Sequence, residues 1–210
     1  LQSFLAEITG MDHVTLQPAA GAHGELTGIM MIKACLQARG EMRKTVLVPD
    51  TAHGTNCSTS TIASYQVVEI KSNERGVIPP EKVAELMNEE VAAIMVTNPN
   101  TLGLFEEHLG EIAEIIHRKG GFVYCDGANL NALMGIVKLG DLGVDVVHLN
   151  LHKTFSTPHG GGGPGAGPVA IKKELAPYLP IPVIEKDSGA FRLNTDRPQS
   201  IGKVRAFYGN

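Results

Sequence analysis

The stretch Val144-Asp145-Val146-Val147-His148-Leu149-Asn150 is a short, mostly apolar run rich in β-branched residues, and Ala92-Ala93-Ile94-Met95-Val96-Thr97 is another. Runs of this kind are typical of strands buried on both faces of a parallel sheet. Parallel strands are joined by crossover segments, most often helices, which cover the sheet. The two runs therefore predict a parallel sheet at the centre of the fold.

The same pattern extends outward along the chain. Segments with apolar residues at helical spacing separate the strand candidates, as at Leu109, Ile112, Ala113 and Ile116. This alternation predicts an α/β fold with a mainly parallel sheet of about seven strands covered by helices. The expected strands are 14–17, 45–48, 66–71, 92–97, 121–126, 144–150 and 168–172, and the expected helices are 24–38, 79–88 and 106–118.

Composition and charge restrict the class of protein. With 210 residues, 43% of them hydrophobic and 19% charged, the chain can bury one sizeable core. A formal net charge of -4 without a basic cluster favours small molecules or proteins as partners over nucleic acid or an anionic membrane. The cysteines Cys35, Cys57 and Cys125 are too widely spaced for a disulfide framework or a zinc site, so a cytoplasmic location is expected.

The composition of the sequence changes after Leu179, where Pro180 and Pro182 precede a polar stretch. We expect residues 1–179 to form one large domain and residues 180–210 to be a surface connection toward a further C-terminal domain. The chain also starts at Leu1 within an amphipathic helical pattern, which suggests a fragment of a longer protein.

In an open parallel sheet the ligand lies beyond the carboxyl ends of the strands, so the loops there are the candidates for chemistry. Lys153 follows a buried strand and precedes the glycine tract 160–165. A buried lysine amine has a lowered pKa and can attack an aldehyde, but a solvated loop lysine is as common. Asp126 ends another strand, where it could keep a heterocyclic nitrogen protonated or simply cap the next helix.

Three further loops carry candidates, each with an ordinary alternative. The small-residue turn 18–25 opens a helix and could bind a phosphate, or could be a plain turn. His53 could stack on a ring or serve as a structural histidine. Asn98 could bind a phenolic oxygen or belong to an Asn-Pro turn.

Two other interpretations of these segments are less consistent with the sequence. Gly160, Gly162 and Gly165 formally satisfy GxGxxG, but the tract leads into a strand instead of a helix, unlike a dinucleotide fingerprint. His152 and His159 with Asp126 match no common spacing of metal ligands, so no metal is expected.

Taken together, these segments resemble the large domain of the glycine decarboxylase family, also called glycine dehydrogenase (decarboxylating) or P-protein, and especially its second-subunit type. The resemblance spans essentially the whole chain. Its most specific string is His152-Lys153-Thr154-Phe155 followed by Pro158-His159 and the glycine tract. The other strong stretches are 17–25, 53–56, 126–131 and 197–202.

The resemblance implies a pyridoxal 5'-phosphate (PLP) oxidoreductase with the fold of aspartate aminotransferase, known as fold type I. It implies decarboxylation of glycine and transfer of the aminomethyl group to the lipoyl arm of H-protein within the glycine cleavage system. The implied partners are the first subunit of glycine decarboxylase, H-protein and further copies in a dimer-based oligomer.

The resemblance also implies roles for single residues. Lys153 would form the Schiff base with the cofactor, Asp126 would pair with its pyridinium nitrogen, and His53 would stack on its ring. Gly21, Ala22 and His152 would lie next to the phosphate. Asn98 and Asn129 are the weaker candidates for a contact with the ring hydroxyl.

One departure from the family pattern and two alternative functions stay open at this point. Where the family is expected to continue with Pro-Ala after Asn56, this chain has Cys57-Ser58. A different fold-type-I enzyme is possible, such as a class V aminotransferase or a cysteine desulfurase that uses Cys57. The chain could also be a non-catalytic domain that only binds cofactor or partner chains.

Overall fold

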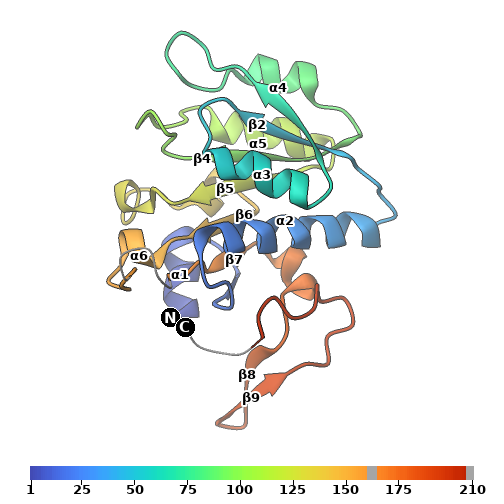
Figure 1. The fold of residues 1–210 in the computed structure, drawn as a ribbon, viewed down its shortest axis with the longest axis vertical. Coiled ribbons are helices and arrows are strands. Elements are labelled where there is room, and N and C mark those ends of the chain that lie inside the picture. Colours follow the sequence, from blue (N-terminus) through green and yellow to red (C-terminus); the bar gives the residue numbers. More distant parts are fainter. Residues whose placement is uncertain (160–164, 207–210) are drawn as a thin grey trace.

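The computed structural model describes residues 1–159 and 165–206, and its centre is a seven-stranded sheet with the order β1-β7-β6-β5-β4-β2-β3 (Figure 1). All seven strand predictions are confirmed, with ends that differ by a few residues. The strands are β1 His13–Thr15, β2 Thr45–Pro49, β3 Gln66–Ile70, β4 Val91–Thr97, β5 Phe122–Gly127, β6 Val146–Leu149 and β7 Val169–Ile171.

Most of the sheet is parallel, as predicted. Strands β2 to β6 pair in parallel, whereas β7 runs antiparallel to β6 and β1 runs antiparallel to β7. The two reversals return β1 to the direction of the parallel strands. The carboxyl ends of six strands therefore meet at one edge of the sheet, which is where ligands bind in open sheets of this type.

Helices cover both faces of the sheet. The helices are α1 Gln2–Thr9, α2 Gly21–Ala38, α3 Gly54–Ile62, α4 Pro80–Leu86, α5 Leu109–Arg118 and α6 Leu151–Thr154, with 3-10 turns η1 Leu130–Ala132, η2 Leu139–Leu142 and η3 Lys173–Tyr178. In Figure 1, α2 and α3 lie in front of the sheet and α5 lies behind it. The predicted helices at 24–38, 79–88 and 106–118 are confirmed, as is the helical start of the chain.

The burial of the strands explains their apolar sequences. Along β4, Ala93 and Met95 belong to a core cluster that also contains residues of α2, whereas Ile94 and Val96 belong to a second cluster that contains residues of α5. Successive side chains of a strand point to opposite faces. Both faces of β4 are therefore covered, and the strand has no polar side.

Residues 180–206 are more structured than the sequence suggested. The expected surface connection contains a hairpin of β8 Val183–Asp187 and β9 Ala190–Asn194, which forms a sheet of its own. Ser188 and Gly189 link the strands with φ values of 49° and 90°, as in a two-residue hairpin turn. The division into 1–179 and 180–210 stays a prediction.

Within the described ranges, none of the helices combines the length and the apolar character that a membrane crossing would need.

Candidate functional site

Three polar side chains lie in a row where β4, β5 and β6 end. The strand register places Thr97 beside Asp126 and Asp126 beside His148, and all three side chains are buried. Asn56 from α3 joins the row: its Nδ2 donates to Asp126 Oδ2 (3.3 Å), and its Oδ1 accepts from Thr97 Oγ1 (3.4 Å). Parallel strands thus bring together residues that are far apart in sequence.

Asp126 is the centre of this row. Its Oδ1 accepts from the Ala128 backbone N–H (2.9 Å) and lies 3.1 Å from His148 Nε2. Burial acts to raise the pKa of Asp126, but the interactions with His148 and the bonds from Ala128 and Asn56 outweigh it and lower the pKa to about 2. The carboxylate is therefore ionised at neutral pH. Because η1 begins at Leu130, Asp126 does not cap that turn.

A second buried acid lies close to this row, and the sequence analysis missed it. Glu25 of α2 accepts from the hydroxyls of Thr55 (2.6 Å) and Thr59 (3.0 Å) on α3. Potential ligand atoms of Glu25, Asp126 and His148 lie within 4.8 Å of one another, whereas the metal set considered from the sequence was Asp126 with two other histidines. A charged residue inside an otherwise apolar helix face was the available signal for Glu25.

Lys153 lies one turn beyond the end of β6, in the short helix α6, and its side chain is exposed. With the Asn150 amide nitrogen facing the Leu149 carbonyl (3.3 Å), the amide oxygen accepts from Lys153 Nζ (3.2 Å). A Cβ built at Gly21 would lie 2.8 Å from the same amide. Asn150 therefore connects the lysine with the start of α2.

The N-terminus of α2 forms a cradle of backbone atoms. A Cβ at Gly167 would lie 2.0 Å from the Ala20 carbonyl oxygen, and a Cβ at Gly24 would lie 2.6 Å from the Gly167 carbonyl oxygen. Only glycine allows this approach. The first N–H groups of a helix have no partner within the helix, so Gly21 and Ala22 present donors to an anion here. Residues 160–164 of the glycine tract that follows Lys153 lie outside the described residues.

His53 has a clear structural role. It is exposed and caps α3, with Nδ1 accepting from the Thr55 backbone N–H (3.1 Å), and its own backbone N–H donates to Thr97 Oγ1 (3.3 Å). These bonds hold it at the carboxyl edge, near Asn56. The stacking role stays a prediction. Cys57 on the same helix is exposed, and partial burial followed by the charge of Glu69 raises the pKa of its thiol.

The two asparagine candidates differ in their free bonding capacity. Asn98 is fully buried, and its Oδ1 accepts from the Glu106 backbone N–H (3.1 Å), but Nδ2 has no partner among the described residues. Asn129 is half-buried, and its Nδ2 already donates to the Pro99 carbonyl (2.9 Å). An unpaired buried donor is costly, so Asn98 is the better candidate for a ligand contact.

His152 follows Leu151 on α6. Its Nδ1 accepts from the Ala166 backbone N–H (3.3 Å), and its ring meets that of His159 edge-on, with centroids 4.3 Å apart. Burial lowers the pKa of His152, and the neighbouring charges of His159 and Lys153 act in the same direction. The imidazole is therefore predominantly neutral at neutral pH.

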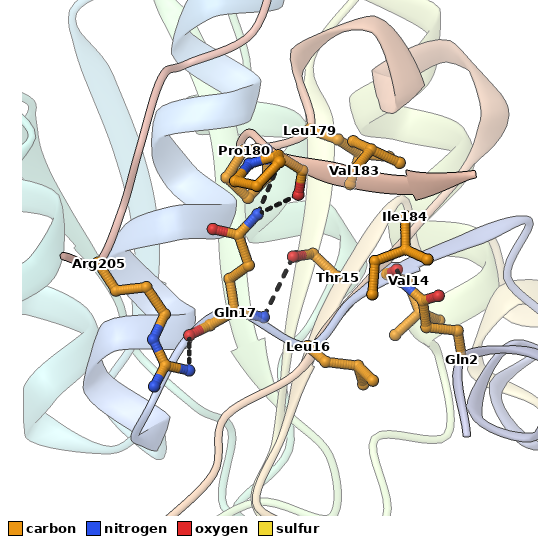
Figure 2. A pocket seen from close by; sticks show the side chains of 11 residues that line it. Gln2, Val14, Thr15, Leu16, Gln17, Leu179, Pro180, Val183, Ile184 and Arg205 are labelled. Carbon is orange, nitrogen blue, oxygen red and sulfur yellow. Dashed lines mark hydrogen bonds between the residues drawn. The ribbon is translucent and has the colours of Figure 1, made fainter. Parts of the chain in front are cut away.

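A pocket of about 260 Å³ lies elsewhere, between the end of β1 and the hairpin segment. Figure 2 shows Gln17 reaching across it, with Nε2 donating to the Pro180 and Pro182 carbonyls at 2.9 Å each. Its walls are mainly apolar, from residues such as Leu16 and Ile184. It shares no residue with the polar row at β4, β5 and β6, so the chemistry-bearing side chains lie outside it.

Comparison with known proteins gives a consistent family. A family model described as glycine cleavage system P-protein matches residues 1–194. The probable glycine dehydrogenase (decarboxylating) subunit 2 of Shouchella clausii is 61% identical to this chain. The match covers 100% of this chain and 43% of the relative. The corresponding protein of Caldanaerobacter subterraneus is also 61% identical, with 44% of its length covered. The chain thus spans less than half of the curated relatives it matches.

Solved structures agree with the predicted fold. A glycine decarboxylase (P-protein) of the glycine cleavage system in inhibitor-bound form superposes with a TM-score of 0.76 and 25% identity, covering 100% of this chain and 48% of that one. A sphingosine-1-phosphate lyase of Burkholderia pseudomallei has a TM-score of 0.67 and 15% identity, covering 92% of this chain and 45% of that one, which supports the fold alone. The fold-type-I prediction is confirmed.

Proposed function

Because the chain belongs to the glycine cleavage system P-protein family, we propose that it is the PLP-binding large domain of an enzyme that decarboxylates glycine. One observation carries the proposal. Asp126 pairs with His148, and Asn150, two residues after His148, contacts Lys153 and the start of α2, so these groups lie together along the carboxyl edge of the sheet. Homology alone would not require these contacts to be intact in so short a chain.

The residues present fit the polar groups of PLP. The N–H groups of Gly21 and Ala22, with His152 nearby, suit the phosphate, and the ionised Asp126 suits a protonated ring nitrogen. Lys153 offers its amine to the aldehyde. Asn98 keeps a spare buried donor for the ring hydroxyl, with Asn129 as a weaker candidate.

Bound PLP would act as the electron sink for the electron pair left when carbon dioxide departs. The chain's own residues would supply position and charge. Asp126 would keep a negative charge fixed at the ring nitrogen, and His53, held by Thr55 and Thr97, would cover one ring face. Lys153, on an exposed turn, would be free to release the cofactor to glycine and to carry a proton. Such fixed geometry is the main contribution of a protein to reactions of this type.

The partners follow from the same family membership. We propose that the product aminomethyl group passes to the lipoyl arm of H-protein and that the first subunit of glycine decarboxylase and a second copy complete the assembly. The relatives are named as a second subunit, which supports the existence of a partner subunit. A cytoplasmic location is consistent with three free cysteines, of which Cys57 is exposed.

The alternative functions have weaker support. A desulfurase needs a reactive thiolate, and the raised pKa of Cys57 disfavours one. The non-catalytic alternative has a specific basis, because the chain spans only 43% of its relative in Shouchella clausii. Such a domain would bind PLP without releasing carbon dioxide.

The first test is the visible absorption spectrum of the chain with PLP, compared with Lys153→Ala. We expect a lysine-bound PLP band that is lost in Lys153→Ala and changes when glycine is added. Lys173→Ala, an exposed lysine on η3, is the matched control and should keep the band. A spectrum without the band in the unmodified chain would disprove cofactor binding.

The second test is carbon dioxide release from labelled glycine, with the first subunit and lipoylated H-protein added. Release that requires H-protein would support the full proposal. A PLP band without release would instead support the non-catalytic domain.

A further inference from the structure

His148 connects two buried groups that the proposed chemistry does not yet explain. Its Nε2 lies 3.1 Å from Asp126 Oδ1, and its Nδ1 lies 2.7 Å from the Tyr124 hydroxyl. The relative exposures of His148, Asp126 and Tyr124 are 1%, 2% and 0%. Burying these three polar side chains costs free energy unless each hydrogen bond between them has a proton donor on one side and an acceptor on the other.

The hydrogen bonds fix where the protons lie. Burial raises the pKa of Tyr124 well above its ordinary value, so its hydroxyl keeps a proton to donate. A donor at Tyr124 requires an unprotonated Nδ1, and the single proton of a neutral imidazole then lies on Nε2. Nε2–H points at the ionised carboxylate of Asp126, which is an acceptor.

The other arrangements of protons fit less well. A neutral ring with the proton on Nδ1 would set the Nε2 lone pair against the Asp126 carboxylate. The Asn150 amide nitrogen, 3.3 Å from Nε2, could donate to that lone pair, but a carboxylate is the stronger partner for an N–H. An imidazolium would leave Tyr124 without its acceptor and would cancel most of the charge on Asp126.

The remaining groups near His148 are already engaged. Glu25, the other acid within reach, accepts from Thr55 and Thr59. Gly28 of α2 makes the hydrogen bond between Tyr124 and His148 possible, since a Cβ there would lie 2.6 Å from Tyr124 Cε2. The helix therefore leaves room for the Tyr124 ring, whose hydroxyl then reaches His148.

We propose that Tyr124 and His148 are positioning residues, and that a neutral His148 with its proton on Nε2 donates the hydrogen bond that orients the Asp126 carboxylate. The cofactor part of this inference rests on the proposed function. A neutral histidine leaves the whole negative charge of Asp126 for the pyridine nitrogen, while Asn56 fixes the second carboxylate oxygen. Tyr124 acts through His148, because its hydroxyl donates to Nδ1 and so keeps Nδ1 unprotonated.

The test begins without cofactor, by 15N NMR of the chain labelled at histidine. The expected spectrum of His148 has a protonated Nε2 and an unprotonated, hydrogen-bonded Nδ1. Tyr124→Phe should shift the Nδ1 signal toward that of a nitrogen without a hydrogen bond. Tyr65→Phe, a second buried tyrosine on the same face of the sheet, is the matched control and should leave His148 unchanged.

A second readout uses PLP affinity. Tyr124→Phe should weaken PLP binding by about tenfold, the change in binding constant that corresponds to the net free energy of one hydrogen bond. His148→Gln, which can still donate an N–H toward Asp126, should bind PLP more tightly than His148→Leu. A purely structural role would predict equal losses for the two variants, provided that circular dichroism shows both to be folded.

The possible results separate the two proposals. A doubly protonated His148, or one with its proton on Nδ1, would overturn the inference even if the variants did not fold. The expected NMR pattern in a chain that binds no PLP would support the proton assignment and disprove the proposed function.

Discussion

At the scale of single residues, Asp145 ties α5 to the sheet at the edge away from the candidate site. Its Oδ2 accepts from the Val123 backbone N–H (2.7 Å) and lies 2.8 Å from His117 Nε2. The hydrogen bond with Asp145 raises the pKa of His117, although burial opposes it. A protonated histidine in the last turn of a helix is also favoured by the helix dipole.

His117→Gln should therefore reduce stability in a pH-dependent way. Because the pKa is raised in the folded state, the stabilisation is fully present below the ordinary value of 6.5 and is lost as pH rises through the folded value. The melting temperature should fall by about 1–3 °C at low pH for so exposed a pair, and by less at high pH. Thermal unfolding between about pH 5.5 and pH 9 measures this.

His108→Gln is the control for this prediction. His108 has a similar exposure, 42% against 40%, but its nearest carboxylate contacts are 3.5 and 3.9 Å long. A larger loss at high pH than at low pH in His117→Gln would contradict the assignment.

The sequence pointed to residues at the ends of apolar strands better than to residues inside strands and helices. Lys153 and Asp126 could be found because they follow apolar strands at the position where ligands bind. His148 lies within such a strand and Glu25 within a helix, so neither lies in the loops where ligand contacts were expected. Their roles depend on cross-strand register and on helix packing, which require the three-dimensional structure. The sequence assigned no role to Asn150, at the end of the predicted strand 144–150.

At the scale of elements, α2 packs unusually close to the sheet. Gly24 and Gly28 lie one turn apart and face β6 and β5, with built Cβ atoms 3.1 Å from His148 Cβ and 2.6 Å from Tyr124 Cε2. Residues four apart share one face of a helix. The two glycines therefore form a flat surface that sets the distance between α2 and the polar row.

Gly28→Ala should destabilise the chain by about 1–3 kcal/mol, because the added methyl group overpacks a core that cannot easily move. The melting temperature should drop by about 2–4 °C for each kcal/mol. Gly110→Ala, in α5, where a Cβ would meet nothing within 4 Å, should leave the melting temperature equal or higher. Equal decreases in melting temperature in both variants would mean that helix propensity, and not packing, determines the change in stability.

The element predictions succeeded where periodicity was strong. The seven strands of the main sheet were predicted, because burial on both faces makes their sequences apolar. Helix α3 was missed because Gly54–Ile62 is mostly Gly, Ser and Thr, and polar side chains such as Asn56 and Thr59 bond to neighbouring elements instead of forming an apolar stripe. The hairpin β8–β9 was missed because most of its residues are exposed, although Ser188-Gly189 was an available turn signal.

At the scale of the whole molecule, the hairpin β8–β9 stands apart from the main sheet (Figure 1). Most of its residues are exposed, and its strands pair only with each other among the described residues. Segments with little buried apolar surface unfold locally at low cost.

Limited trypsin digestion should therefore cut first after Lys186 or Arg192, before any site within residues 1–179. Mass spectrometry of the first products identifies the cut. Arg192→Gln should remove one of the two products and leave the other. Early cleavage at exposed Arg75 or Lys119 would instead show that the large domain is less stable than the hairpin.

The position of β1 has a consequence for biosynthesis. Of the seven strands of the main sheet, β1 is made first, yet it pairs only with β7, the last of them, through contacts such as Thr15 with Val169. A ribosome adds about 5–20 residues each second, so β1 must wait for seconds without its partner. Strand β1 is therefore the strand of the main sheet that needs protection, by a chaperone or by transient local structure, until synthesis has passed β7.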